Sequence, residues 1–370
     1  DTLFYRYTRL VSLNDVGAEP RRFGLSVAAF HQANQQRARY LPHSMLGTST
    51  HDSKRSEDVR ARLNVLSEIP HAWKALVHDL EALGQRFGTT IDGIDAPSRH
   101  DLWSLCQAMV GIWPAQRSTP EQRATLVERL QQYMVKAMRE AKLATNWLFP
   151  NEAYEGAVTQ YIEKTLSSER FVSTLEDFVQ RVAPQGFRNS LCQLALKLTV
   201  PGVPDIYQGC EVWNFSLVDP DNRRPVEFGP LAKSLSAVRS MYAEGRFPTP
   251  AEWRQVLGEG TQMPDAAKQL VTWRLLQLRR QWPALFRDST YLPLSIIGGE
   301  EAAGARALAF ARIREGDAFV VVSSRLMLRQ HDPEGASLMA RATLDIAQAH
   351  PTLARAGLWR DWLTGETFNT

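Results

Sequence analysis

The feature that most constrains the fold is a helical pattern that continues, with short breaks, from Ser56 to roughly Ser190. Its clearest helix starts at Thr119-Pro120-Glu121-Gln122, where a capping box is combined with proline at the first helical position. Apolar residues then recur on one face of that helix. We expect about five successive helices with no strand between them. This pattern predicts an inserted helical subdomain over residues 64–190.

The segments after the helical region are shorter. A helix over 191–198 leads into the run from Pro201 to Gly209, which predicts a short strand followed by a glycine turn. An amphipathic helix follows at about 265–281, and apolar residues alternate with other residues beyond Pro283. A strand, a polar loop, a helix and a closing β region are how a (β/α)8 barrel ends when a β domain follows it.

The predicted fold class is therefore α/β: the C-terminal part of a (β/α)8 barrel with a large helical insertion, followed by a small antiparallel β-sandwich domain. We divide the chain into a barrel segment at 1–63, the helical insertion at 64–190, a second barrel segment with its last helix at 191–283, and the sandwich at 284–370.

The composition excludes several classes of protein. The chain has 370 residues, of which 44% are hydrophobic and 22% charged, and its net charge is +3. Cations and acids are interleaved, so we expect no nucleic-acid partner. No apolar run approaches the ~18 residues that span a bilayer, so we expect no membrane partner. Cys106, Cys192 and Cys210 lie far apart and predict reduced thiols in a cytoplasmic protein. Because Asp1 stands where an initiator methionine belongs, we expect further chain before it.

The candidate site is the stretch 46–63, in which His51 and Asp52 follow small and hydroxyl residues. A serine followed by two acids marks a helix start just after them, so the pair lies on a loop that precedes a helix. A carboxylate beside an imidazole on such a loop can bind sugar hydroxyls or offset positive charge at an anomeric carbon. The pair alone is weak support, because a structural ion pair with Lys54 or Arg55 is the more common explanation.

Two motifs resemble those of the α-amylase superfamily of glycoside hydrolases and transglycosylases. Thr50-His51-Asp52 is similar to the motif that follows barrel strand seven, and the run from Pro201 to Glu211 is similar to the strand-eight motif, Pro-Gly-x-Pro leading to Tyr-x-Gly-x-Glu. Three longer strings resemble the maltooligosyltrehalose synthase family within it: Thr48 to Leu63, Ala141 to Glu155 and Leu217 to Pro225. The resemblance covers essentially the whole chain and matches the C-terminal half of that family.

The resemblance implies a retaining mechanism, in which an Asp nucleophile forms a covalent glucosyl intermediate and a Glu serves as acid and then base. Asp52 matches the family's third carboxylate, which grips ring hydroxyls in the transition state, with His51 beside it. The family's nucleophile and acid/base lie upstream, and only about 50 residues precede Asp52, whereas a whole barrel takes ~250. We therefore expect both groups to lie outside this chain, and the chain alone to be inactive.

Further substrate contacts are expected on the two loops. The residues predicted to bind substrate are Lys54, Arg55, Tyr207, Gln208, Asp221, Asn222 and Arg223. Lys54 and Arg55 could equally form structural ion pairs. Tyr207 and Gln208 could equally have a packing role. Glu211 and Asp219 are expected to be rim or supporting groups. Among the ten tryptophans, which are mostly core residues by default, only Trp213 is nominated as a stacking platform.

For the full-length protein, the resemblance implies an isomerase that performs intramolecular transglucosylation. The reducing-end α-1,4 link of a maltooligosaccharide would become an α,α-1,1 link, which is a step of trehalose biosynthesis. Water must be kept from the intermediate, a task that suits the helical insertion. We expect no metal and no organic cofactor; the expected partners are the glucan substrate and the N-terminal half of the same protein. Two alternatives stay open: a related α-glucan hydrolase or transglucosylase, and a non-catalytic glucan-binding module.

Overall fold

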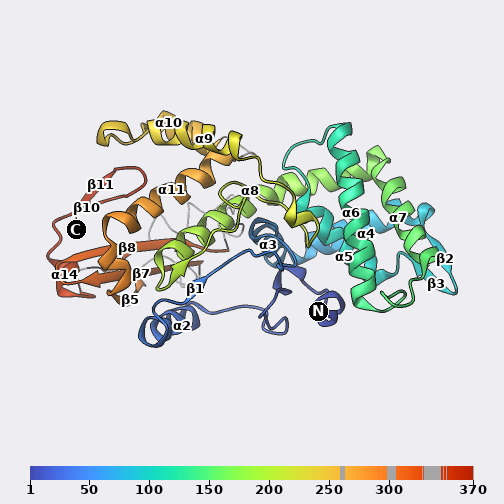
Figure 1. Cartoon of the computed structure of the whole chain (residues 1–370), viewed down its shortest axis with the longest axis horizontal. Helices are drawn as coiled ribbons and strands as arrows, with labels where there is room; N and C mark the ends of the chain where they lie inside the picture. Colours follow the sequence, from blue (N-terminus) through green and yellow to red (C-terminus); the bar gives the residue numbers. More distant parts are fainter. Residues whose placement is uncertain are drawn as a thin grey trace.

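The helices predicted for the middle of the chain are present in the computed structural model, which describes residues 1–258, 263–297, 306–326, 328, 343–344, 346 and 348–369. They are α4 (Pro70–Gly84), α5 (Arg99–Ile112), α6 (Pro120–Ala141), α7 (Glu152–Leu166) and the first part of α8 (Glu169–Thr199). The capping box predicted for α6 is confirmed, because Thr119 and Gln122 each bond to the other's backbone N–H. These helices form one end of the molecule (Figure 1).

A β-hairpin interrupts the helical region and corrects the expectation that no strand lies there. Strand β2 (Thr89–Ile91) pairs antiparallel with β3 (Ile94–Ala96). The turn residues Asp92 and Gly93 have φ values of 50° and 79°. Positive φ at both positions is what a two-residue type I′ turn requires, and Asp-Gly is a favoured pair there. Strands of three residues are too short to produce a clear period-two pattern, so only the Asp-Gly pair signals the hairpin in the sequence.

Two short parallel strands carry the two motifs singled out in the sequence. Strand β1 (Met45–Leu46) pairs with β4 (Val203–Pro204), so the loops that follow them leave the same edge of one small sheet. Gly202 has a φ of +129°, and a Cβ on it would lie 2.7 Å from side-chain atoms of Leu46. Only glycine therefore permits this close approach. Three further helices of the N-terminal part are α1 (Thr2–Arg6), α2 (Val27–Tyr40) and α3 (Glu57–Asn64).

The C-terminal end combines helices with small antiparallel sheets. Its helices are α9 (Phe228–Ser240), α10 (Pro250–Leu257), α11 (Asp265–Gln281), α12 (Pro283–Arg287) and α14 (Pro351–Ala354). Its strands are β5 (Thr290–Leu294), β6 (Ile296–Ile297), β7 (Ala307–Arg314), β8 (Asp317–Ser324), β9 (Thr343–Leu344), β10 (Leu358–Arg360) and β11 (Thr367–Asn369). They pair antiparallel in the orders β5-β7-β8, β6-β9 and β10-β11. Antiparallel pairing of short strands is confirmed, while the sandwich and the assignment of the chain to the C-terminal part of a (β/α)8 barrel stay predictions.

Helix α8 is a single helix of 31 residues, although the sequence suggested a separate helix over 191–198. Pro184 lies inside it and removes one backbone hydrogen bond, yet the helix continues on both sides of this proline. One part of α8 packs against α3 and α4, and another packs against α11 and β8. The helix therefore joins the helical end to the C-terminal end (Figure 1).

The largest buried cluster fills the helical end, where Trp113, Tyr154 and Phe171 are completely buried. Smaller clusters lie between α8, α11 and the sheet strands of the C-terminal end. Among the described residues, we find no helix that is both long and apolar enough to cross a membrane.

Candidate active site

The predicted His-Asp pair lies on an exposed loop after β1. The side chains of His51 and Asp52 are 64% and 60% exposed, and His51 Nε2 lies 3.2 Å from Asp52 Oδ2. Hydroxyl groups fix this loop: Thr50 Oγ1 accepts a hydrogen bond from the Asp52 backbone N–H at 3.2 Å, and Ser53 Oγ accepts one from the Thr50 N–H at 2.9 Å. The Asp52 carboxylate is thus held by its backbone while most of its surface stays open to a ligand.

The loop after β4 meets the His-Asp loop. Asn222 Nδ2 donates to the His51 carbonyl oxygen at 3.0 Å, and the Tyr207 hydroxyl donates to the Asn222 carbonyl oxygen at 3.3 Å. The Arg223 guanidinium lies 3.7 Å from Asp52 Oδ1. Three of the predicted binding residues are therefore gathered around His51 and Asp52, which makes a polar surface suited to hydroxyl groups.

Asp221 anchors this second loop to the helical end. Its carboxylate accepts two hydrogen bonds from Arg129 on α6, at 2.9 and 2.8 Å, and a third from the Leu217 backbone N–H at 2.8 Å. The Asp221 side chain is only 10% exposed. Because its oxygens are occupied by protein donors, this geometry favours a positioning role for Asp221 over the predicted substrate contact.

Lys54 and Arg55 have protein partners. Lys54 is buried, and its Nζ lies 3.2 Å from Asp1 Oδ1. Arg55 is also buried and donates to the Tyr133 hydroxyl at 2.5 Å and to the Val11 carbonyl at 3.3 Å. Of the two interpretations offered by the sequence, the structural one is favoured for both cations.

The remaining candidates differ in exposure. Gln208 is exposed, whereas Tyr207 is half-buried. Trp213 packs against Phe187, with ring centres 4.7 Å apart, and its indole N–H donates to the Met263 carbonyl at 2.8 Å. These contacts favour packing, rather than sugar stacking, for Trp213. One carboxylate oxygen of Glu211 is buried without a protein hydrogen-bond partner.

Asp219, expected as a rim or supporting group, bridges the loop and α6. Its Oδ1 accepts a hydrogen bond from Lys136 Nζ at 2.5 Å, and its Oδ2 lies 4.0 Å from Arg223. Partial burial by itself would raise the pKa of the Asp219 carboxyl, but the hydrogen bond and charge of Lys136, with the charge of Arg223, lower it. Asp219 therefore stays ionised beside the cation that faces Asp52.

A buried cluster of charges lies close behind the loop. On α3, Glu57 and Asp58 are buried and share Lys268 of α11, whose Nζ is 2.8 Å from Glu57 Oε1 and 2.7 Å from Asp58 Oδ2. Lys197 of α8 lies 3.4 Å from Glu57. Burial raises the pKa of Asp58. For Glu57 burial also acts upward, but the charges of Lys268 and Lys197 prevail and lower its pKa to about 2.

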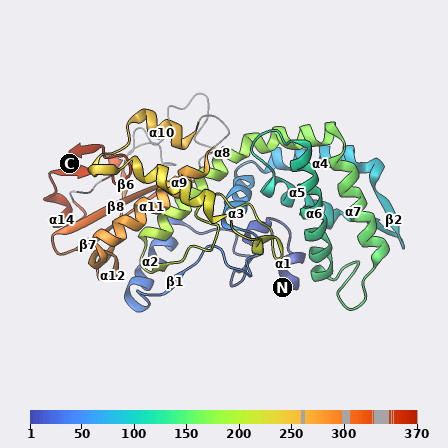
Figure 2. The same cartoon turned by 45° about the horizontal axis from the view of Figure 1, so that its top comes forward.

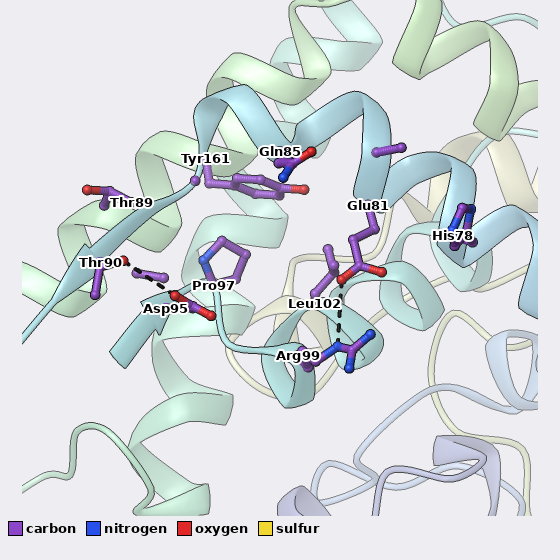
Figure 3. Close-up of a pocket in the computed structure, with 13 residues that line it drawn as sticks. His78, Glu81, Gln85, Thr89, Thr90, Asp95, Pro97, Arg99, Leu102 and Tyr161 are labelled. Carbon is purple, nitrogen blue, oxygen red and sulfur yellow. Dashed lines mark hydrogen bonds and ion pairs between the residues drawn. The ribbon is translucent and has the colours of Figure 1, made fainter. Parts of the chain in front are cut away.

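A separate cavity of about 500 Å³ lies in the helical end, between α4, α7 and the hairpin (Figure 3). Glu81 and Arg99 face each other across its rim at 3.7 Å, and Thr90 donates to Asp95 at 3.4 Å. None of the predicted site residues lines it. Among the described residues we also find no group of three or more His, Cys, Asp or Glu side chains placed to hold a metal ion.

The sequence did not single out Arg129 and Lys136, which hold the second loop, or Trp147, which is half exposed near it. Cations on a helix surface carry no sign of their distant partners. Trp147 gave a signal that was available: Trp147-Leu148-Phe149 is an apolar run outside any helical face, and loop residues of this kind often have a binding role.

The chain is α/β, with two adjacent parallel strands that carry these two loops, and the solved structures similar to it are of the α-amylase type. No family model matches the sequence. The relatives found are maltooligosyltrehalose synthases, and the chain is related to them over nearly its whole length, which confirms the resemblance predicted from the sequence.

The similarity extends over most of this chain but over less than half of each relative. A Mycobacterium tuberculosis protein assigned as a maltooligosyl trehalose synthase is 38% identical over 329 residues, which cover 89% of this chain and 37% of that protein. The maltooligosyltrehalose synthase of Arthrobacter ramosus has a TM-score of 0.77 at 33% identity, over 99% of this chain and 41% of that one. A Sulfolobus tokodaii protein described as a hypothetical maltooligosyl trehalose synthase has a TM-score of 0.72 at 30% identity, over 100% and 42%. The chain thus spans about 40% of the length of these relatives.

Proposed function

We propose that the full-length protein converts the reducing-end α-1,4 link of maltooligosaccharides into an α,α-1,1 link, and so makes a trehalose end. The observation that carries this proposal is the contact of the His51–Asp52 loop, which follows β1, with Asn222 and Arg223 of the loop after the adjacent parallel strand β4. The chain that holds this contact is related to maltooligosyltrehalose synthases. The proposed class is an isomerase, an intramolecular glucosyl transferase of trehalose biosynthesis.

In the proposed mechanism Asp52 binds ring hydroxyls of the glucose being cleaved. Its carboxylate also offsets the positive charge that develops at the anomeric carbon in an oxocarbenium-like transition state. His51 and Arg223 flank the carboxylate at 3.2 and 3.7 Å, and they would orient it and share the hydroxyl contacts. The nucleophile and the acid/base would come from the N-terminal half of the same protein.

The cleaved glucose must stay bound and turn over before it is joined again through its own anomeric hydroxyl. Water reaching the glucosyl intermediate would release free glucose instead. The helical end is bound to the second loop through Arg129 and Lys136, so it is placed to shield this side of the site. We propose a cytoplasmic location, because the three cysteines are unpaired thiols. We also propose that the 370-residue chain alone is inactive.

The test is incubation of the full-length protein with maltopentaose, with and without Asp52→Asn, followed by measurement of reducing ends and free glucose. We expect wild type to lose reducing ends with little glucose released, and the variant to lose about 10³-fold in kcat. Asp288→Asn, which alters another exposed carboxylate at the far end of the chain, is the control and should keep full activity.

Other outcomes of the same experiment separate the alternatives. Glucose as the main product would make the protein a related α-glucan hydrolase. Binding of maltopentaose without any product would favour a glucan-binding module. Full activity of Asp52→Asn would contradict the role proposed for that carboxylate, whatever the product.

A further inference from the structure

We propose that Trp147 is a stacking platform for a glucose ring of an α-glucan whose reacting end lies at Asp52. This inference rests on the proposed function and adds a second region of sugar contact on the helical end. Neither the family resemblance nor the loops after β1 and β4 assign a substrate role to this residue.

The first observation is a cleft that joins Trp147 to the polar loop. The cleft has a volume of about 640 Å³. It is lined by Gln131, Gln132, Val135, Lys136, Trp147, Thr159, Asp219 and Pro220. Asp219 also lies 4.0 Å from Arg223, which in turn lies 3.7 Å from Asp52. A chain of polar groups therefore leads from the proposed reacting centre to the cleft. Figure 2 shows α6 and α7 together at the helical end, beside the loop that joins them.

The second observation is that the indole is fixed before any ligand arrives. The Arg139 guanidinium lies 4.9 Å from the centre of the Trp147 ring, and the indole N–H donates to Glu140 Oε1 at 3.1 Å. Arg139 is itself held by two hydrogen bonds to Glu155, at 2.8 and 2.7 Å. Trp147 nevertheless stays 49% exposed. A ring that is already held in place loses little freedom when a sugar stacks on it.

The loop that carries Trp147 is also held by its own hydrogen bonds. Helix α6 ends at Ala141, and the next residue, Lys142, has a φ of 54°. Asn146 Oδ1 then accepts bonds from the backbone N–H groups of Leu148 and Phe149, at 3.0 and 2.8 Å. Thr145 Oγ1 accepts one from the Asn151 N–H at 2.8 Å. The exposure of apolar side chains on this loop is thus built into its backbone and is not a sign of disorder.

The chemistry of the lining favours a sugar over a protein partner. A glucose ring has an apolar face and a rim of hydroxyls, so it needs an aromatic surface with polar groups beside it. Lys136 Nζ carries three N–H donors and gives two to Asp219, at its carbonyl and carboxylate oxygens. Lys136 and Gln132 both line the cleft, so the third Lys136 donor and the Gln132 amide lie beside a bound ligand. The occupant that fits this combination is a glucose unit of a maltooligosaccharide.

The experiment compares Trp147→Ala, Trp147→Phe and Leu148→Ala in the full-length protein. Leu148 is the matched control, because it is 83% exposed on the same loop and does not line the cleft. With maltoheptaose we expect Trp147→Ala to raise KM about tenfold with kcat within about twofold, since an aromatic contact of this kind is worth up to ~1.5 kcal/mol. Trp147→Phe should keep most of the affinity, and Leu148→Ala should behave as wild type.

The second readout is the quenching of tryptophan fluorescence when maltoheptaose binds. We expect wild type to show it, Trp147→Phe to lose most of it, and unchanged thermal melting in all three variants. A wild-type KM for maltoheptaose in Trp147→Ala would overturn the platform, as would quenching retained in Trp147→Phe. The two proposals fail separately: absence of a trehalose-ended product would refute the proposed function, while the fluorescence titration would still test Trp147.

Discussion

Asp52 and Glu57 are neighbours along the chain, yet their carboxylates have opposite surroundings. Asp52 is 60% exposed, and within the described part of the chain its carboxylate pairs with His51 and, at 3.7 Å, with Arg223. Glu57 is buried, and Lys268, Lys197 and Thr48 all contact its carboxylate. A carboxylate whose oxygens are filled by protein donors has nothing left for a substrate. The two acids at the start of α3 therefore stabilise the fold, whereas the carboxylate of Asp52 can still accept hydrogen bonds from a substrate.

The largest effect expected from this comparison follows the removal of Lys268. In Lys268→Met two carboxylates would remain buried without their shared cation, which costs about 3–5 kcal/mol of unfolding free energy. The matched control is Arg287→Met, which breaks an exposed ion pair with Asp288 that has the same 2.8 Å distance. Exposed pairs are worth about 0–1 kcal/mol, so the control should melt as wild type. Urea unfolding of the full-length protein would measure both, and equal losses would break the comparison.

A smaller loss of stability is expected at Arg129, whose burial is intermediate between that of Lys268 and that of Arg287. It is partly buried and anchors the loop that carries Asn222 and Arg223 through its paired bonds to Asp221. Arg129→Met should lower the unfolding free energy by about 1.5–3 kcal/mol, as expected for a charged hydrogen bond.

The same variant should lower kcat more than it changes KM for a short substrate, because Asp52 would lose the alignment of its neighbour Arg223. Arg129→Lys keeps the charge without the paired geometry and should recover only part of the rate. A kcat that follows stability alone, with no recovery in Arg129→Lys, would mean that Arg129 serves only the fold.

The smallest effect expected at neutral pH is on the contribution of Glu57 to stability, and this contribution depends on pH in the acidic range. Since the folded-state pKa of Glu57 is about 2, below its ordinary 4.5, its contribution to stability is complete above about pH 4.5 and is lost as the pH falls toward 2. Glu57→Gln should therefore lose less stability over that range than wild type. The raised pKa of Asp58 acts in the opposite direction, so Glu57 must be changed alone.

The control for this prediction is Glu252→Gln. The hydrogen bond from Arg246 lowers the pKa of Glu252 to about 2 as well, but this carboxylate is partly exposed, whereas that of Glu57 is buried. We expect high salt to remove the acid dependence due to Glu252 and to leave that due to Glu57, because salt screens exposed charges far more than buried ones. Urea unfolding across this pH range at low and high salt would show this. Equal sensitivity to salt at both sites would contradict it.

Much of this arrangement could be predicted from the sequence, where the signal was local. The capping box at Thr119 and Gln122 fixed the start of α6. The two motif resemblances pointed to the loops after β1 and β4, and the contact between Asn222 and His51 joins these two loops. What the sequence could not supply was the partner of each charge. The sequence allows Arg55 to be a sugar contact, but the structure buries it against Tyr133. Nothing in the local sequence reveals a partner 78 positions away.

Long-range burial also explains the other differences. The sequence predicts a substrate contact for Asp221, but Arg129 donates hydrogen bonds to both of its carboxylate oxygens. Trp213 is the tryptophan that the sequence nominates as a platform, yet its ring packs against Phe187. Exposure decides which aromatic ring can meet a sugar, and exposure depends on how distant helices pack, which the sequence pattern does not show.

The unbroken course of α8 sets an angle as well as a distance between the two ends of the molecule. One residue inserted after Pro184 would rotate the helical end by about 100° about the helix axis and shift it by about 1.5 Å. Such a rotation would swing the Trp147 cleft away from Asp52. Even two added turns, about seven residues, would restore the direction but separate the ends by about 10 Å. We therefore expect evolutionary gains and losses of residues to be absent from α8 and to gather in loops such as that between α6 and α7.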